Sequence, residues 1–217
     1  MKLNCITPIF LSLLITFCIP FSSSICQTKE KGKNLSIEEI NKLRDIEQQP
    51  EKVMDVIKLR QGMKIGEAGA SYGYFTFKLS ARVGNTGIVY ANDIAPSALD
   101  KIERKCKSDK ITNIKTVLGI EDDPLFPNKN LDMIVVFDCL FEFSKPMEWM
   151  LNSKKYLNSG GKLVIVDPDP SKEKNGDFLT RKQIVDYAEK AGYAVIMVDD
   201  SFLKRMMIIM LEPKILK

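Results

Sequence analysis

Short apolar runs alternate with helical periodicity through most of this chain, and that alternation predicts a βαβ order. Runs at residues 63–68, 88–92, 114–118, 131–137 and 162–166 have the length and composition of buried strands. Apolar residues recur at helical spacing in residues 74–83, 96–106, 146–157 and 180–190. Two further apolar runs, 195–198 and 206–211, read as a final pair of strands. The pattern therefore predicts an α/β fold with a mainly parallel sheet.

Two helices are expected before the first strand. Ser36 and Glu39 form the sequence of a capping box, which predicts that a helix begins here. The run after it is apolar-periodic, at Ile37, Ile40, Leu43 and Ile46. Pro50 suits the first position of a second helix, which should stop before Gly62. That helix is expected to carry Val53, Met54 and Ile57 inward.

The first 26 residues have the pattern of an export signal. Lys2 precedes an apolar run, residues 6–21, that is too short for a spanning helix and ends in three serines. Cys26 follows in a loose lipoprotein-type processing box, so we expect an exported protein, periplasmic or anchored to a membrane through a lipid on Cys26. The alternative is an uncleaved N-terminal membrane anchor with the domain facing the cytoplasm, which the lysines in residues 29–33 favour. The expected organisation is a leader at 1–26, a polar linker at 27–35 and one domain at 36–217.

Composition narrows the classes of function. The 217 residues suffice for one domain plus an extension. The net charge is only +4 and is spread through mixtures of Lys and Glu, so the sequence does not indicate a basic surface that binds nucleic acid. The chain contains no histidine, which removes the usual imidazole metal ligand and the commonest general base. Cys106 and Cys139 lie in the expected domain without metal-type spacing, so no metal site is predicted.

The candidate chemistry gathers around a glycine-containing turn after the first predicted strand. Glu67 ends that strand, and Gly69, Ser71 and Gly73 follow at alternate positions before a helix. Small residues let the backbone turn sharply and approach a ligand, and the free N–H groups of the helix suit an electron-rich one. Asp93 closes the next strand, 20 residues after Gly73. Since ligands bind at the carboxyl ends of parallel strands, the turn and Asp93 should meet at one crevice.

Three kinds of site compete for this turn. A nicotinamide dinucleotide site needs a third glycine where Tyr74 stands, although Asp93 fits the expected acid. A nucleophile elbow matches residues 69–73 letter for letter, but a Ser-His-acid triad cannot be built without histidine. The third kind is an S-adenosylmethionine site.

Residues 67–73, Glu-Ala-Gly-Ala-Ser-Tyr-Gly, resemble the acid-x-G-x-G-x-G signature of class I S-adenosylmethionine-dependent methyltransferases, with Ser71 at the central glycine. The similarity runs from about Gln49 to about Asp167 and is like that of small bacterial methyltransferase-domain proteins, several of them exported. The resemblance implies a Rossmann-like doubly wound sheet with helices on both faces and an antiparallel C-terminal strand pair. It also implies S-adenosyl-L-methionine as cofactor.

The resemblance assigns roles residue by residue. Glu67 would orient the methionine amino group or the turn, and Asp93 would accept both ribose hydroxyls. Glu121 or Asp122 would face the adenine amino group, although an ordinary solvated acidic turn explains them equally well. The implied cofactor-binding set is Glu67, Gly69, Ser71, Gly73, Asp93, Ile94, Glu121, Asp122 and Asp138.

No catalytic base is assigned, because methyl transfer from a sulfonium needs one only for some acceptors. Glu142 and Asp138 are the nearest carboxylates, and the histidine that relatives often carry past the fourth strand is replaced by Phe141 and Glu142. The leading hypothesis is a methyltransferase acting on an unknown small-molecule, lipid or protein acceptor. A non-catalytic binding module on the same scaffold and a nicotinamide oxidoreductase are the alternatives. The sequence indicates neither the acceptor nor the oligomeric state.

Overall fold

The structure is a computed structural model, and it describes residues 35–201 and 203–214. The predicted leader at 1–26 and nearly all of the predicted linker lie outside the described residues. The chain divides into a unit before Ser36 and a compact unit from Ser36 onward. The sheet, its helices and the candidate site all belong to the second unit.

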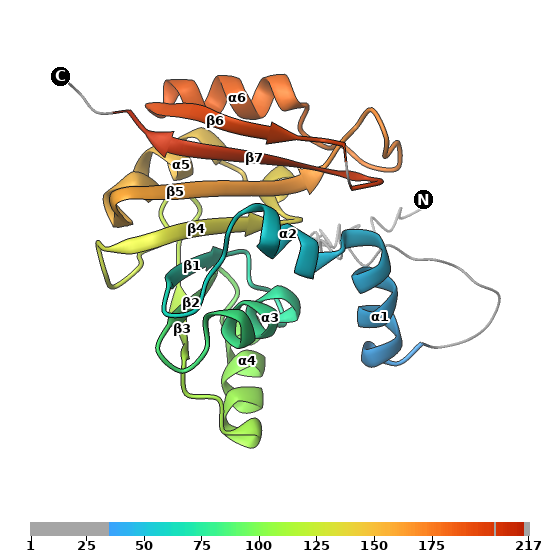
Figure 1. Cartoon of the computed structure of the whole chain (residues 1–217), viewed down its shortest axis with the longest axis vertical. Coiled ribbons are helices and arrows are strands. Elements are labelled where there is room, and N and C mark those ends of the chain that lie inside the picture. The colour runs from blue at the N-terminus through green and yellow to red at the C-terminus, as the bar shows by residue number, and fades with distance from the viewer. Residues whose placement is uncertain (1–34, 202, 215–217) are drawn as a thin grey trace, which may run out of the picture. The chain divides into compact units, whose positions relative to one another are not determined.

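A seven-stranded sheet forms the centre of this unit, in the order β3-β2-β1-β4-β5-β7-β6 (Figure 1). The strands are β1 (Lys64–Ala68), β2 (Ile88–Asp93), β3 (Ile114–Leu118), β4 (Leu131–Phe137), β5 (Leu157–Pro168), β6 (Tyr193–Asp199) and β7 (Met206–Pro213). The first five pair in parallel, and β7 lies antiparallel between β5 and β6. The predicted Rossmann-like topology with an antiparallel C-terminal pair is confirmed.

Helices cover both faces of the sheet. They are α1 (Ile37–Gln48), α2 (Pro50–Val56), α3 (Tyr74–Val83), α4 (Pro96–Asp109), α5 (Pro146–Ser153) and α6 (Arg181–Lys190), with short 3₁₀ turns at Leu140–Glu142 and Lys154–Tyr156. Side chains of α2, α3 and α4 pack into one buried cluster, which includes Val53, Leu79 and Ile102. Those of α5 and α6 pack into another, which includes Trp149 and Ile184.

β1 lies at the centre of the sheet, between β2 and β4, and this position fixes the site. Its chain continues to β2 on one side, whereas β4 joins its other edge from later in the sequence. This is the topological switch point, where loops from the two halves of the sheet separate and leave a crevice at the carboxyl ends of the strands. The residues that follow β1, β2 and β4 therefore face a common space.

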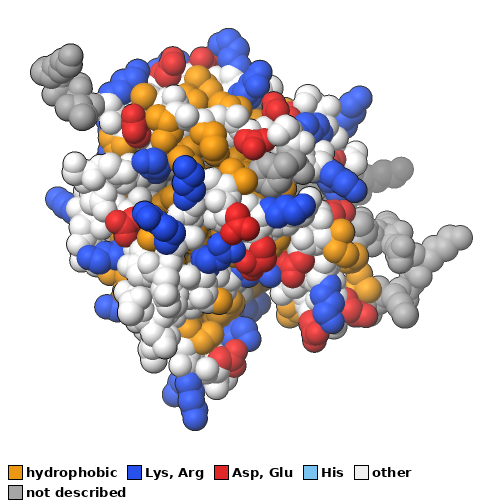
Figure 2. All heavy atoms as spheres, viewed as in Figure 1, with side chains coloured by type: hydrophobic (Ala, Val, Ile, Leu, Met, Phe, Trp, Pro, Cys, Tyr) orange, Lys and Arg blue, Asp and Glu red, His pale blue; other side chains and the backbone are white. Residues whose placement is uncertain are grey.

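Acidic and basic side chains are interspersed on the face drawn in Figure 2, without a broad area of one sign. Within the described residues, no helix is long and apolar enough to cross a membrane.

Candidate functional site

The turn from β1 to α3 has the backbone that its small residues suggested. Gly69, Ser71 and Gly73 all have positive φ, at 73°, 48° and 87°. A Cβ at Gly69 would lie 2.4 Å from the sulfur of Cys139, and one at Gly73 would lie 2.5 Å from the Phe77 ring. Glycine is thus required at both positions by conformation and by space. The result is a compact loop whose backbone stands open at the start of α3.

Asp93 and this turn meet directly, as expected. One carboxylate oxygen accepts the Ser71 N–H at 2.8 Å, and the other accepts the Ala95 N–H at 2.9 Å. A carboxylate oxygen accepts more than one hydrogen bond, so Asp93 keeps acceptor capacity towards the crevice. The Ser71 N–H fixes Asp93 relative to the turn even though Ser71 replaces the expected glycine.

Glu67 is the most unusual ionisable group of the site. Its side chain is 2% exposed, and its Oε2 has no hydrogen-bond partner among the described residues. Burial raises the pKa of this carboxyl to about 8, partly opposed by the nearby Thr76 hydroxyl. Asp93 raises the same pKa and Arg44 lowers it. The site therefore holds an acid that is mostly protonated at neutral pH.

The loop after β3 carries the predicted adenine-side acids at the surface. Glu121 is exposed, with a carboxylate oxygen 3.5 Å from the Lys145 ammonium. Asp122 is half-buried and accepts the Asn152 amide N–H through its backbone oxygen, at 2.8 Å. The buried acid of this loop is Asp123, which accepts the Tyr156 hydroxyl at 2.6 Å and so anchors the loop.

Apolar side chains stand exposed beside that loop. Ile94 follows β2 and is 60% exposed, while Leu118 ends β3 and Ile120 follows it, each about half exposed. The buried amide of Asn92 donates to the backbone oxygens of Val117 and Pro124, which fixes the end of β3 and the loop after it. These side chains form an open apolar surface at the ends of β2 and β3, next to Asp93.

Asp138, at the end of β4, faces helix α1. It has φ of 59°, and its carboxylate accepts the Gln48 amide N–H at 2.6 Å, with the Arg44 guanidinium at 3.6 Å. Burial raises the pKa of Asp138, and Arg44 and Gln48 oppose that rise. Asp167 fixes the turn after Asp138 by accepting backbone N–H groups from three successive residues, Cys139, Leu140 and Phe141.

Helix α1 supplies site residues that the sequence did not single out. Besides Arg44 and Gln48, Asp45 accepts the Tyr74 hydroxyl at 2.8 Å and lies 2.8 Å from the Lys78 ammonium. The Arg44 guanidinium lies 3.7 Å from the centre of the Tyr74 ring. The capping box predicted the start of α1, but nothing in its sequence shows that its polar residues reach the ends of other elements.

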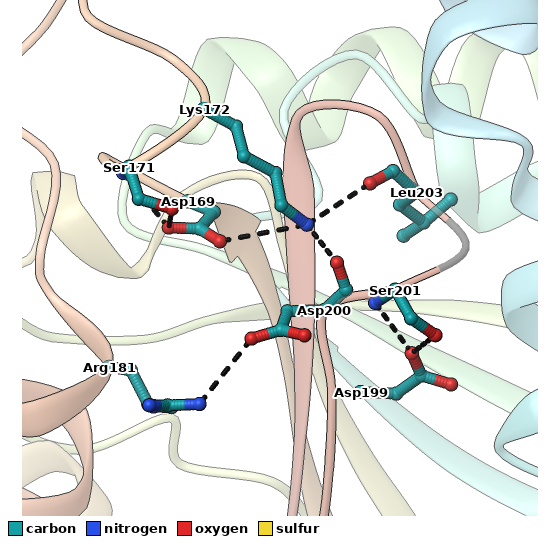
Figure 3. Close-up of polar contacts among 8 residues, drawn as sticks. All are labelled: Asp169, Ser171, Lys172, Arg181, Asp199, Asp200, Ser201 and Leu203. Atoms are coloured by element: carbon teal, nitrogen blue, oxygen red, sulfur yellow. Dashed lines mark hydrogen bonds and ion pairs between the residues drawn. The ribbon is translucent and has the colours of Figure 1, made fainter.

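Polar contacts join the loop after β5 to the β6–β7 turn (Figure 3). Asp169 accepts the Ser171 N–H and hydroxyl, and the Lys172 ammonium lies 3.7 Å from the Asp169 carboxylate. Lys172 also donates to the backbone oxygens of Asp200 and Leu203, across to the turn (Figure 3). The loop after β5 is therefore tied to the hairpin of β6 and β7. No group of three or more acidic or cysteine side chains suited to a metal ion occurs among the described residues.

The structure thus brings together Glu67, Gly69, Ser71, Gly73, Asp93 and Asp138 around the ends of β1, β2 and β4. Ile94 lies at the same edge, directly after Asp93, whereas Glu121 and Asp122 lie on the loop after β3, with Glu121 turned to Lys145.

Comparison with known proteins agrees with this geometry. The family model of the methyltransferase domain matches residues 59–201. The protein-L-isoaspartate O-methyltransferase of Methanothrix thermoacetophila is 27% identical over 111 residues, covering 51% of this chain and 50% of that protein. The chain thus spans about half the length of the curated relatives it matches.

Solved structures show the same fold. A methyltransferase from Aquifex aeolicus, described as dependent on S-adenosylmethionine, superposes with a TM-score of 0.72 at 23% identity, covering 82% of this chain and 98% of that one. The geranyl diphosphate C-methyltransferase of Streptomyces coelicolor, solved with S-adenosyl-L-homocysteine, has a TM-score of 0.66 at 12% identity, covering 81% of each chain. On the strength of the family match, this chain belongs to the methyltransferase-domain family of class I S-adenosylmethionine-dependent enzymes.

Proposed function

We propose that this protein transfers the methyl group of S-adenosyl-L-methionine to a small-molecule, lipid or protein acceptor. The observation that carries the proposal is the hydrogen bond from the Ser71 N–H to Asp93 at the switch point of the sheet. It joins the glycine-containing turn to an acid that is able to accept ribose hydroxyls, which is the arrangement a nucleoside ligand requires.

The residues present fit this cofactor. Gly69 and Gly73 leave room for backbone approach, and the unpartnered Glu67 oxygen offers an acceptor at the end of β1. Asp93 would hold the ribose, and Ile94 with Ile120 would cover the adenine. S-adenosylmethionine brings an activated methyl group on a sulfonium, so the protein's own task is to bind, align and exclude water.

The acceptor side is formed by the ends of β4 and β5. Asp138 and Glu142 are the carboxylates there, and Phe141 packs edge-on against Phe178 at 4.9 Å between ring centres. An acceptor that loses its proton easily, or has none to lose, suits a site that has no histidine. The nicotinamide oxidoreductase alternative has no support from the family match, whereas a non-catalytic binding module remains the alternative to activity.

The N-terminal pattern supports an exported protein, periplasmic or held at a membrane by a lipid on Cys26 or by the apolar segment. The alternative of an uncleaved anchor with the domain facing the cytoplasm would give the enzyme direct access to the cofactor pool.

Calorimetric titration separates these functions. We expect the purified protein to bind S-adenosylmethionine and S-adenosylhomocysteine at micromolar concentration and not NAD. Incubation with methyl-labelled S-adenosylmethionine and fractions of the host cell should then transfer label to an acceptor. Binding without transfer to any fraction would favour the non-catalytic module, and no binding of either adenosyl ligand would overturn the proposal.

Asp93→Ala tests the ribose role. Loss of hydrogen bonds to an ionised acceptor should cost about 1.5–3 kcal/mol, or roughly ten- to a hundredfold in affinity for S-adenosylhomocysteine. Asp100→Ala, on the exposed side of α4, is the matched control and should bind normally. Unchanged affinity in a folded Asp93→Ala protein would contradict the role.

A further inference from the structure

The segments that lead into the amino ends of the strands carry basic residues and no acidic ones. These segments are 57–63 before β1, 84–87 before β2, 110–113 before β3, 127–130 before β4, 154–156 before β5 and 190–192 before β6. Each of them except 84–87 contains a lysine or an arginine, and none contains an aspartate or a glutamate.

The sheet topology puts all of these segments at one end of the domain. Strands β1 to β5 run in parallel, and β6 runs with them because β7 is antiparallel to both β5 and β6. Their amino ends therefore lie at one edge, on the left of Figure 1, where β4 and β5 begin. β7 ends at the same edge, and Lys214 follows it. We call this the amino edge, and the opposite edge, which holds the candidate site, the site edge.

The cations of the amino edge also lack acidic partners. Lys155 is the exception, because its ammonium pairs with the Asp123 carboxylate. None of the other cations in these segments makes an ion pair within the described part of the chain, and all of them except Lys154 are exposed. At the site edge, by contrast, acidic and basic residues are mixed and several are paired, as in the ion pair of Arg205 with Glu173.

Three of these lysines come together around Gly192. The Lys154 ammonium lies 2.7 Å from the position that a Cβ on Gly192 would take. The Lys214 N–H donates to the Gly192 backbone oxygen at 2.9 Å, and Lys190 stands two residues before Gly192. Like charges that are gathered in this way repel one another, so an anionic surface placed against them is attracted.

The chemistry of the amino edge fits an anionic lipid surface better than a nucleic acid. The cations in its segments are lysines apart from Arg60, whereas bidentate recognition of phosphates uses arginine. Tyr72 is the one exposed aromatic residue in the part of the chain that the structure describes, and it lies at the site edge, so the amino edge offers no exposed ring for stacking on bases. An anionic bilayer attracts each nearby lysine without requiring a fixed geometry. The N-terminal sequence also has the pattern of a segment directed to a membrane.

We propose that the amino edge is a docking surface for a bilayer that contains anionic lipids. The arrows of β4 and β5 in Figure 1 point away from this edge, so a docked domain turns the site edge towards the aqueous phase. The methyl acceptor would then be a soluble molecule or protein rather than a lipid of that bilayer, and this last step rests on the proposed function.

Co-sedimentation of the full chain with lipid vesicles tests the surface. Vesicles of phosphatidylcholine alone are compared with vesicles in which about one third of the lipid is phosphatidylglycerol. The triple variant Lys154→Gln/Lys190→Gln/Lys214→Gln should bind the anionic vesicles at least about tenfold more weakly than wild type, because three charges near the lipid are removed. Raising the salt from about 0.1 M to about 0.5 M should release the wild type, since salt screens this attraction.

The matched control removes the same charge from the other edge. Lys101→Gln/Lys174→Gln/Lys204→Gln changes exposed lysines that make no ion pair among the described residues, and it should bind the vesicles like wild type. The N-terminal leader is common to all three proteins, so a difference between them reports on the domain. The melting temperature and the affinity for S-adenosylhomocysteine should be the same in all three, which keeps this test apart from that of the methyltransferase proposal.

Hydrogen exchange of the vesicle-bound protein measures the orientation. We expect slower exchange in residues 57–63 and 110–113 than in the unbound protein, and no change in residues 169–180 of the loop after β5. Slowing at residues 169–180 instead, or equal binding of both triple variants to the anionic vesicles, would overturn the docking surface. Binding to RNA without binding to anionic vesicles would overturn it in favour of a nucleic-acid surface.

Discussion

At the scale of single residues, Glu67 is a buried ionisable group in the candidate site, and its burial makes the stability of the protein depend on pH. Its carboxyl is fully enclosed, faces Thr76, and feels Asp93 and Arg44, with burial raising its pKa from 4.5 to about 8. The folded protein therefore binds more protons than the unfolded chain between these two values. The free energy of unfolding must therefore fall as pH rises from 4.5 to about 8, because the unfolded chain gives up this proton more readily than the folded protein does.

Glu67→Gln should remove this dependence. Glutamine does not ionise, so the free energy of unfolding of the variant should rise relative to wild type by on the order of 3 kcal/mol between pH 5 and pH 8. Urea unfolding at the two pH values measures the difference. Glu148→Gln, at an exposed position on α5, should leave the pH dependence of the wild type in place. Equal pH dependence in Glu67→Gln and wild type would refute the raised pKa.

Ser71 stands at the central glycine of the signature that this turn resembles, and its φ of 48° puts serine in the left-handed region. A non-glycine residue in the left-handed region destabilises the folded state by roughly 1 kcal/mol or more. Glycine instead increases the conformational entropy of the unfolded chain, which lowers stability by about 0.4–1 kcal/mol. These effects nearly cancel, so Ser71→Gly should unfold within about 0.5 kcal/mol of wild type and retain or improve cofactor affinity.

Calorimetry with S-adenosylhomocysteine also tells whether the site has decayed. Similar micromolar affinity in wild type and Ser71→Gly would indicate a working site that accepts serine. A weak wild type with a glycine variant at least tenfold tighter would indicate a decaying one. Ser71→Val is the contrasting variant, because a β-branched residue fits the left-handed region poorly and should be destabilised.

At the scale of elements, strands and glycine turns were predictable from the sequence, whereas the placement of α1 was not. The capping box located the start of α1, yet the structure buries none of its residues, and Ile37 and Ile46 are 78% and 72% exposed. A spacing of three residues drifts around a helix that turns 100° per residue, so these apolar positions do not share one face. Contacts between polar residues distant in sequence position α1, and no local pattern encodes them.

Helix α5 shows the same limit on a smaller scale. Apolar residues at helical spacing in residues 146–157 predicted one helix that reaches residue 157. In the structure the helix ends at Ser153, Trp149 is itself core at 2% exposed, and Leu151 is 48% exposed. β5 begins already at Leu157, which pairs with Leu131, so pairing with β4 ends the helix early. The register then shifts, and the next pair is Met133 with Lys162.

Because polar contacts hold α1, it should be the least stable helix of the site. Its ties are Arg44–Asp138, Asp45–Lys78 and Glu47–Arg205. Hydrogen exchange should therefore be faster in α1 than in α3, whose Leu79 and Val83 are fully buried, and should slow in α1 when S-adenosylhomocysteine binds. Equal protection of both helices in the free protein, unchanged by ligand, would contradict this picture of α1.

At the scale of the whole molecule, the position of the candidate site follows from the sheet topology through one general rule. Parallel strands joined by helices leave a crevice where the strand order reverses, and Glu67, Asp93 and Asp138 each stand at or just after the end of a strand beside that crevice. The identity of the methyl acceptor does not follow from any such rule, because individual contacts determine the conformation of the loops that border the site. Asp123 anchors the loop after β3, and Asp167 anchors the turn after β4, each from a buried position that no short motif marks.

The N-terminus of the mature protein should reveal where the domain works. Lys2, the short apolar run at residues 6–21 and the serines before Cys26 have the pattern of a processed leader. Mass spectrometry of the protein from its native host should then find no peptide from residues 1–24, and a mature chain that begins at an acylated Cys26 would identify the lipoprotein form. Cys26→Ser is the control that should abolish acylation and release the domain from membranes.

An intact Met1 in a membrane fraction would instead establish the uncleaved anchor, and an intact Met1 in the cytosol would rule out both forms of export. The distinction bears on mechanism, since S-adenosylmethionine is made in the cytoplasm and an exported enzyme would need a route of cofactor supply.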